Sequence, residues 1–326
     1  MSRRAIVMMT LLAFCFLSGG GLQAAEKYPV KPIVYIVPVE AGAGGDIIAR
    51  GLTKKAQALL GQPVVIINKP GGGSSIGYRE IYSAKPDGYT IGVGMATIVT
   101  NKLQGILPYD YNDFTILGVY ANYNPIIVAS TKTQRQFKTI EEVFAYAKVH
   151  PGELSMATGG IGQASWIATM AFLEGTGLKF NVIPQPGAEA YIMTQVAGGH
   201  TDLAMVGGLH AAKPQIEAGN VRFLAYYGAK RPPGYLNVPT LKDVGFDMSW
   251  DSAHVALGPP NMPKDIVDKL VKTIDVLAND PEFQTFLAER SGIRLYLSPE
   301  QAMPFFDKQR KLLRSIMEKT GILKEK

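Results

Sequence analysis

Cysteine is almost absent from this chain of 326 residues, because its single cysteine, Cys15, lies within the first 25 residues. Without that segment the protein has no thiol, which excludes disulfides and cysteine nucleophiles. Long apolar runs are also missing beyond residue 25, where no stretch approaches the roughly 18 uninterrupted apolar residues of a membrane helix. A dense basic cluster is missing as well before the C-terminal helical region. Nucleic-acid binding is therefore not expected.

What is present at the start of the chain is the pattern of a secretory signal peptide. Arg3 and Arg4 precede an apolar run over residues 5–17, and a mostly small tail then ends at Ala25. We therefore predict a signal peptide over residues 1–25 and an exported mature protein. Removal of the two arginines lowers the formal net charge from +6 to about +4, a mild positive excess that suits an anionic ligand.

Beyond the signal peptide, short apolar runs bounded by glycine and proline alternate with helical patterns. The predicted strands cover residues 33–37, 64–67, 89–93, 154–157, 181–184, 202–206 and 223–227. The predicted helices cover residues 46–60, 76–83, 140–148, 164–174, 188–197 and 211–218, and residues 264–318 are mostly helical. This alternation is typical of α/β folds with largely parallel strands. Because it forms two similar blocks, we predict two lobes around a ligand, with crossings at 119–130 and 247–259.

Glycine-rich loops follow the first two predicted strands. The segment "AGAGGD" occupies residues 41–46 and "KPGGGSSIG" occupies residues 69–77. Both lie at the carboxyl ends of strands, where open α/β sheets bind ligands. Glycine permits positive φ and close backbone approach, so successive N–H groups can converge on an oxyanion. If helices begin near Asp46 and Ser75, their amino termini add partial positive charge. The two loops therefore predict a cradle for a carboxylate.

The second loop also fits a different chemistry, because residues 73–77 match G-x-S-x-G, the nucleophile elbow of serine hydrolases. Such an elbow places its serine directly after a strand, whereas the predicted strand ends near Ile67, well before Ser75. A serine nucleophile also needs a histidine base, and none of the four histidines stands in a recognisable pairing. We expect no catalytic residue, and a secreted hydrolase that uses Ser75 is the alternative to a receptor.

Cofactor and metal patterns are also missing. The segment "GAGGDIIA" lacks the final glycine of G-x-G-x-x-G, since Ile47 occupies that position, and no Gly-Lys-Ser/Thr phosphate loop occurs. His150, His200, His210 and His254 are scattered along the chain, with no spacing of a metal-ligand set. We therefore expect no cofactor and no metal site.

Eight segments, in a fixed order, carry a resemblance to a known family. They are "YPVKPIVYIVPVEAGAGGD", "LGQPVVIINKPGGGSSIG", "AKPDGYTIGVG", "YDYNDFT", "ATGGIGQASW", "GGHTDLAM", "AGNVRFLAYYGAKRPPGYLNVPTLKDVG" and "GPPNMP". Over nearly all of its mature length, the chain resembles the periplasmic solute-binding receptors of tripartite tricarboxylate transporters, of the Bug and TctC type.

The resemblance implies a two-lobed α/β fold of the periplasmic-binding-protein architecture, with the ligand in the interlobe cleft and two crossing segments. Lobe one would comprise residues 26–124 plus 251–326, and lobe two residues 125–250. The implied ligand is a small carboxylate: a dicarboxylate, a tricarboxylate or an aromatic acid. The implied partner is a membrane transporter, or a sensor if the protein is a binding adaptor without a transport role. We expect a periplasmic monomer.

The resemblance also implies the ligand-binding residues. In lobe one these are Ala41, Gly42, Ala43, Gly44 and Asp46 of the first loop, Gly72, Gly73, Ser74 and Ser75 of the second, and Thr97 and Asn101 after the third strand. In lobe two they are Thr158, Gly159, Gln163, Ser165 and Trp166 of "TGGIGQASW", with Gln185 and Gly187 of the loop "PQPGAEA".

Some positions depart from the pattern of the family. Glu40 stands just before the first glycine loop, where its carboxylate would repel an anion, so we expect it to face solvent or to recognise a cationic group. Trp166 replaces a common histidine, and it either packs within lobe two or stacks against a flat ligand. Gln185 replaces a common tyrosine. These departures leave recognition of the far end of the ligand open.

Overall fold

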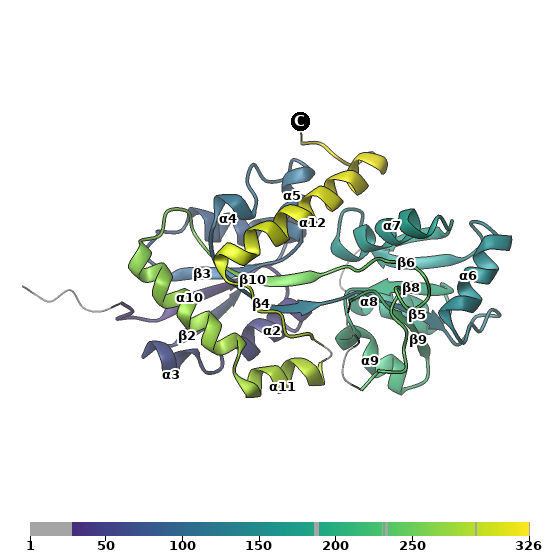
Figure 1. The fold of residues 1–326 in the computed structure, drawn as a ribbon, viewed down its shortest axis with the longest axis horizontal. Helices are drawn as coiled ribbons and strands as arrows, with labels where there is room; N and C mark the ends of the chain where they lie inside the picture. The colour runs from purple at the N-terminus through teal and green to yellow at the C-terminus, as the bar shows by residue number, and fades with distance from the viewer. Residues whose placement is uncertain (1–27, 186–188, 230, 232–233, 291, 326) are drawn as a thin grey trace, which may run out of the picture.

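Two five-stranded mixed sheets lie side by side in the computed structural model, which describes residues 28–185, 189–229, 231, 234–290 and 292–325 (Figure 1). We call the part built around the sheet β2-β1-β3-β10-β4 lobe one, and the part built around β7-β6-β8-β5-β9 lobe two. The predicted two-lobed α/β class is confirmed. The predicted signal peptide lies outside the described residues. Among the described helices, none is both long and apolar enough to cross a membrane.

Lobe one begins with three parallel strands, β1 (Ile33–Val37), β2 (Val64–Asn68) and β3 (Thr90–Gly94). Two more strands, β4 (Thr115–Tyr123) and β10 (Ser252–Gly258), complete the sheet, and β10 is antiparallel to both of its neighbours. The helices of this half are α2 (Gly44–Thr53), α3 (Ala56–Leu60), α4 (Ser75–Ser83) and α5 (Thr97–Leu103), with short 3₁₀ turns η1 (Gly72–Ser74) and η2 (Tyr111–Asp113). Successive residues of β1 are buried in different apolar clusters, Tyr35 in one and Ile36 in the other. Both faces of the sheet are therefore covered, as expected for parallel strands.

Lobe two has the same plan. Its strands are β5 (Ile126–Ser130), β6 (Ser155–Gly159), β7 (Asn181–Gln185), β8 (Leu203–Val206) and β9 (Val221–Tyr226), and its helices are α6 (Ile140–Val149), α7 (Ala164–Thr176), α8 (Glu189–Gly198) and α9 (Leu209–Glu217). The strand β6 is parallel to β7 and β8, whereas β5 is antiparallel to β8 and β9. Each sheet is therefore mixed, because the strand that arrives from the other lobe enters in the opposite direction.

Strands occupy much of both predicted crossings. The predicted crossing at 119–130 consists mostly of β4 and β5, so only residues 124–125 separate the two strands. Likewise, much of the predicted crossing at 247–259 is β10, and the connection from β9 covers residues 227–251. The apolar residues at both crossings form strands that pair within the two sheets, whereas the sequence pattern predicted connecting segments there.

Three helices end the chain: α10 (Lys264–Ala278), α11 (Pro281–Glu289) and α12 (Pro299–Lys319). The last begins at the predicted N-cap, Ser298, whose hydroxyl accepts the Gln301 N–H in a capping box, with Pro299 in the first turn. Figure 1 shows α12 running from lobe one toward α7 of lobe two. At that end, Lys319 pairs with Glu174 of α7. The C-terminal helix is thus a third link between the lobes.

Two predictions of local structure need correction. The predicted helix at 46–60 is broken into α2 and α3, and Thr53 at the end of α2 donates its hydroxyl to the Ala49 carbonyl at 2.8 Å. Such bonds from threonine to the preceding turn tend to bend helices. The segment after the third strand, treated as a loop in the sequence, forms α5 and carries Asn101.

Candidate ligand-binding site

The first glycine loop, between β1 and α2, is held in shape by one buried carboxylate. Asp46 is 2% exposed and accepts the Gly42 N–H at 2.8 Å, the Arg50 side chain at 2.9 and 3.0 Å, and the Asn68 amide at 2.9 Å. Burial tends to raise the pKa of Asp46, but the hydrogen bonds from Arg50, Gly42 and Asn68 outweigh it and lower the pKa. Both carboxylate oxygens are therefore engaged inside the protein. Asp46, predicted as a ligand contact, holds the loop in position.

The hydrogen bonds to Asp46 predict that removing its charge destabilises the protein. Asp46→Asn should lower the free energy of unfolding by about 2 kcal/mol, because charge-assisted hydrogen bonds to the buried carboxylate are lost. The half-exposed Arg50 side chain keeps the effect below that of a fully buried pair. Urea unfolding at pH 7 measures the change. Glu40→Gln is the matched control, since Glu40 belongs to the same loop and is exposed. Equal effects of the two substitutions would contradict this role of Asp46.

The second loop contains an unusual run of left-handed backbone. From Gly71 to Ser74 the φ values are 114°, 56°, 62° and 78°. For Ser74, which has a Cβ, this conformation costs on the order of 1 kcal/mol. Asn101 compensates by donating its amide to the Gly73 carbonyl at 3.0 Å. The change from left-handed Ser74 to right-handed Ser75 is a turn of the kind that forms anion-binding nests.

A tyrosine behind the second loop joins α4 to the third strand. The Tyr78 hydroxyl lies 2.7 Å from the Thr97 hydroxyl and accepts the Met95 N–H at 3.2 Å. Burial raises the pKa of Tyr78 to about 12, so the phenol stays neutral. Thr97 and Asn101, both predicted as ligand contacts, therefore also support the loop from behind.

Ser75 does not have the surroundings of a nucleophile. It begins α4, and residues 69–74 separate it from the end of β2 at Asn68. Among the hydrogen bonds of the described residues, none joins Ser75 to a histidine. The match to G-x-S-x-G is therefore accidental.

In lobe two, the loop after β6 is stabilised by its own polar side chains. The Gly159 N–H donates to the Ser165 hydroxyl at 3.0 Å, and the Gly160 N–H donates to the Gln163 amide oxygen at 3.2 Å. Behind them, the Thr169 hydroxyl donates to the Thr158 hydroxyl at 3.4 Å. These predicted contact residues again define the shape of the loop.

Of the remaining predicted residues of lobe two, the two that the structure describes are both buried. Trp166 is only 7% exposed and belongs to the large apolar cluster, which favours packing over stacking on a ligand. Gln185, at the end of β7, is 8% exposed. Gly187 lies outside the described residues. In lobe one, Ala41 and Glu40 are exposed, as expected for Glu40.

The loops of the two lobes meet in this structure. A Cβ built on Gly44, the first residue of α2, would lie 2.7 Å from the His210 Nε2 atom of lobe two. Likewise, a Cβ on Gly162 of lobe two would overlap the Gln104 amide of lobe one. The structure thus places Gly44, one of the predicted residues, against lobe two. The lobes are in direct contact there.

The sequence analysis missed three polar residues at this interface. His210 lies 3.3 Å from Glu189, and His254 of β10 lies near Gly45 of α2. Burial, and next the nearby His210, lower the pKa of His254 to about 4. Nothing in the spacing of these residues indicates that they meet. One feature of the sequence could have indicated this part of the site. Gly207 and Gly208 directly follow a predicted strand, as the glycines of the two lobe-one loops do.

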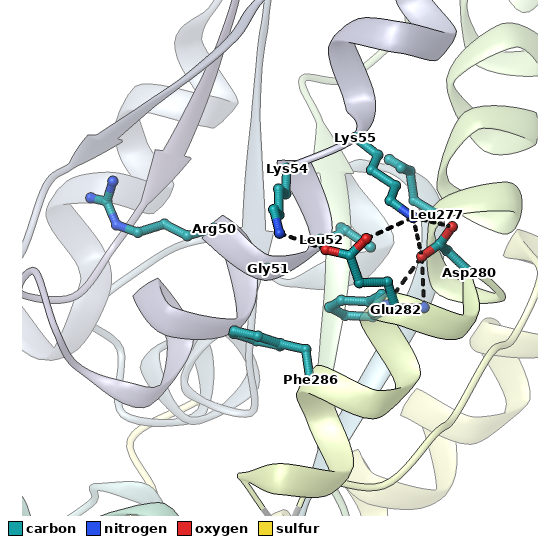
Figure 2. A pocket seen from close by; sticks show the side chains of 10 residues that line it. Arg50, Gly51, Leu52, Lys54, Lys55, Leu277, Asp280, Glu282 and Phe286 are labelled. Atoms are coloured by element: carbon teal, nitrogen blue, oxygen red, sulfur yellow. Dashed lines mark hydrogen bonds and ion pairs between the residues drawn. The ribbon is translucent and has the colours of Figure 1, made fainter.

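Two surface hollows lie away from the glycine loops. Figure 2 shows the first, of about 200 Å³, between α2, α3, α10 and α11. Its lysines are already paired, Lys54 with Glu282 at 2.5 Å and Lys55 with Asp280 at 3.0 Å, so it offers little to an anion. The second, of about 480 Å³, lies between α9 and α11. Within the described part of the chain, no group of three or more His, Cys, Asp or Glu side chains could hold a metal.

Comparison with known proteins adds an independent line of argument. A family model described as the tripartite tricarboxylate transporter family receptor matches residues 48–322. The chain is 30% identical to a Cupriavidus necator protein from the gbd 5′ region over 304 residues, which cover 92% of this chain and 90% of that protein. Among solved structures, the periplasmic binding protein BugD is 28% identical with a TM-score of 0.75, and the match covers 91% of this chain and 99% of BugD. An R. palustris protein solved with adipate is 25% identical with a TM-score of 0.80, over 91% and 99% of the two chains.

Proposed function

The chain belongs to the tripartite tricarboxylate transporter receptor family, and on that premise we propose that it binds a small carboxylate between its lobes and delivers it to a membrane transporter. Like its relatives, it is a solute-binding receptor and not an enzyme. The signal-peptide pattern and the family together support a periplasmic location. We propose lobe bounds of 26–124 plus 251–326 and 125–250.

The observation that carries the carboxylate proposal is the second glycine loop. Four consecutive residues, Gly71 to Ser74, have positive φ, and Asn101 holds the loop by donating its amide to the Gly73 carbonyl. The first loop leads into the amino terminus of α2 at Gly44, where N–H groups lack intrahelical acceptors. Backbone donors of this kind bind carboxylates without lysine or arginine.

Two observations, the burial of Trp166 and a related structure, support one class of carboxylate. Trp166 packs in the apolar core, so it offers no open aromatic face to a flat acid. The related R. palustris protein was solved with adipate, a flexible dicarboxylate. We therefore place aliphatic dicarboxylates first among the candidate ligands, ahead of tricarboxylates and aromatic acids.

A thermal-shift screen of residues 26–326 against these carboxylates tests the proposal. A ligand that binds only the folded protein stabilises it by about 2.7 kcal/mol at a hundredfold excess over its Kd. We expect adipate or another aliphatic dicarboxylate to raise the melting temperature. Citrate and benzoate serve as the tricarboxylate and aromatic comparisons.

Two glycines with positive φ provide a matched pair of variants. Gly73→Ala disturbs the proposed cradle, whereas Gly61→Ala changes the C-cap of α3, where a Cβ meets nothing within 4 Å. Both should cost about 1 kcal/mol of stability, because both residues are left-handed. Only Gly73→Ala should lose the ligand-induced shift. A blank panel, or an unchanged shift in Gly73→Ala, would count against the carboxylate cradle.

A further inference from the structure

We propose that His210 is a latch that lobe two presents to α2 of lobe one, and that its contact with Gly44 stabilises the closed cleft. The inference deepens the proposed function and rests on it, since a latch matters only where the lobes close on a ligand. His210 is a positioning residue in this proposal and does not bind the ligand itself.

The imidazole of His210 is fitted between two glycines. A Cβ on Gly44 would lie 2.7 Å from Nε2, and a Cβ on Gly208 would lie 2.8 Å from Nδ1. Real Cβ atoms do not approach so closely, so any other residue at either position would displace the ring. Gly44 belongs to lobe one and Gly208 to lobe two. The fit therefore exists only while the lobes are together.

Contacts other than the one with Gly44 hold the ring in this orientation. Nε2 lies 3.3 Å from a Glu189 carboxylate oxygen, and the other oxygen of Glu189 accepts the Gly207 N–H at 2.7 Å. The ring also lies 5.0 Å from the ring of Tyr123, the last residue of β4, at an interplanar angle of 73°. Such an edge-to-face arrangement is a favourable one for aromatic rings. Glu189 of lobe two and Tyr123 at the end of β4 thus orient His210 independently of its contact with Gly44.

The contact couples closure to the proposed ligand site. Gly44 is the first residue of α2, whose amino terminus belongs to the proposed cradle. Opening the cleft withdraws Gly44 and exposes the ring, whereas the pairing of His210 with Glu189 lies within lobe two and persists. A contact made in one state only shifts the population toward that state. His210 therefore raises the fraction of closed protein, and with it the apparent affinity.

The same geometry keeps the latch weak. The buried Nδ1 atom has no hydrogen-bond partner among the described residues. An unpaired buried polar atom opposes burial, so the contact is only modestly favourable. This suits a receptor that must reopen to release its ligand.

Hydrogen exchange of the ligand-free mature protein tests the latch. In His210→Ala, the amides of residues 44–47 should exchange about fivefold faster than in the wild type, because loss of the contact favours the open form. Small-angle X-ray scattering should show a larger radius of gyration. His200→Ala is the control, since His200 is an exposed histidine of lobe two, and it should change neither measurement.

A second variant guards against a folding defect. Gly44→Ala places a methyl group where the His210 ring lies, and it does so at a helical position with ordinary φ. It should therefore open the cleft as His210→Ala does. Melting curves and circular dichroism establish that each variant is folded. Identical exchange and scattering in the wild type and in the folded variants would overturn the latch. Since no ligand is present, a blank carboxylate screen would remove the proposed function and leave this result standing.

Discussion

Asp251→Ala is expected to lower the free energy of unfolding by about 3 kcal/mol, since it removes an acceptor shared by both interlobe crossings. One oxygen of this carboxylate accepts the side-chain amides of Asn122 at 2.6 Å and Asn124 at 3.1 Å. Asn122 is the penultimate residue of β4, and Asn124 follows that strand, so both belong to the first crossing. Asp251 itself ends the second crossing, just before β10.

The network extends from Asp251 into both lobes. The Tyr226 hydroxyl of β9 donates to the Asn124 side chain at 2.9 Å, and Gln309 of α12 donates to the Asp251 carbonyl at 2.5 Å. Burial, and next the Asp251 charge, raise the pKa of Tyr226 well above its ordinary value, so the phenol remains a donor. Asn124 also donates to the Trp250 carbonyl, and Asn122 donates weakly to the Asn124 amide oxygen at 3.4 Å, so removal of Asp251 leaves one N–H of each buried amide without an acceptor, which is costly.

Urea unfolding at pH 7 measures the effect of Asp251→Ala. Asp251→Asn keeps the size of the side chain and one acceptor oxygen, so its cost should be smaller, about 1 kcal/mol. Asp247→Ala, in the same crossing, removes a carboxylate whose side chain is 89% exposed and should have almost no effect. If Asp251→Ala were as stable as Asp247→Ala, the network would not stabilise the crossings.

Acid should destabilise the protein through His254. The imidazole of this residue is 5% exposed, and burial followed by the nearby His210 lowers its pKa from 6.5 to about 4. Tyr120 and Tyr123 of β4 are the other titratable groups around the ring, at centroid distances of 6.3 and 5.9 Å. Both are neutral at these pH values, because burial raises the pKa of each phenol. The Ser252 backbone alone favours the charged imidazole, and burial and His210 outweigh it.

The direction of the pH effect on stability follows from the pH at which the folded and the unfolded protein each protonate His254. The unfolded chain protonates His254 near pH 6.5, whereas the folded protein does so only near pH 4. Between these values the unfolded state binds more protons, so stability falls as the pH falls. The contribution is fully present above pH 6.5, and about 3 kcal/mol of it is lost by pH 4.

Urea unfolding at pH 7, 5.5 and 4.5 measures this dependence. His254→Phe keeps an aromatic ring beside Tyr123 but takes up no proton, so its stability should change far less between pH 7 and 5.5. Carboxylates titrate mainly below that interval, which separates their effect from that of the histidine. The same slope in both proteins would show that His254 is not the group responsible.

Much of the fold could be predicted from local pattern. The predicted strand at 33–37 is β1, and the helices near Ile140 and Ala164 begin where the pattern places them. The N-cap at Ser298 was predicted as well, because capping depends on a few neighbouring residues. The predictions were weakest at the crossings, where β4, β5 and β10 were taken for connections. Their pairing partners lie far away in the sequence, so no local pattern identifies the strands.

The candidate site, too, could be predicted from the sequence only in part. Positions of the glycine loops follow from the sequence, since glycines after apolar runs indicate turns at the ends of strands. Which side chains support those loops does not follow from it. Asp46, Thr97 and Asn101 were predicted to touch a ligand, and the structure places their polar atoms against the protein's own backbone and side chains.

The amino-acid sequence was enough to determine the α/β class, because periodicity and glycine placement are properties of neighbouring residues, and the resemblance of eight segments was enough to indicate the family. Only the tertiary structure decided that His210 meets Gly44 and that Asp251 joins Asn122 to Asn124. Those contacts depend on how two lobes, each made of distant segments, come together. Side chains from different lobes meet only after both sheets have formed, and no spacing along the chain records that meeting.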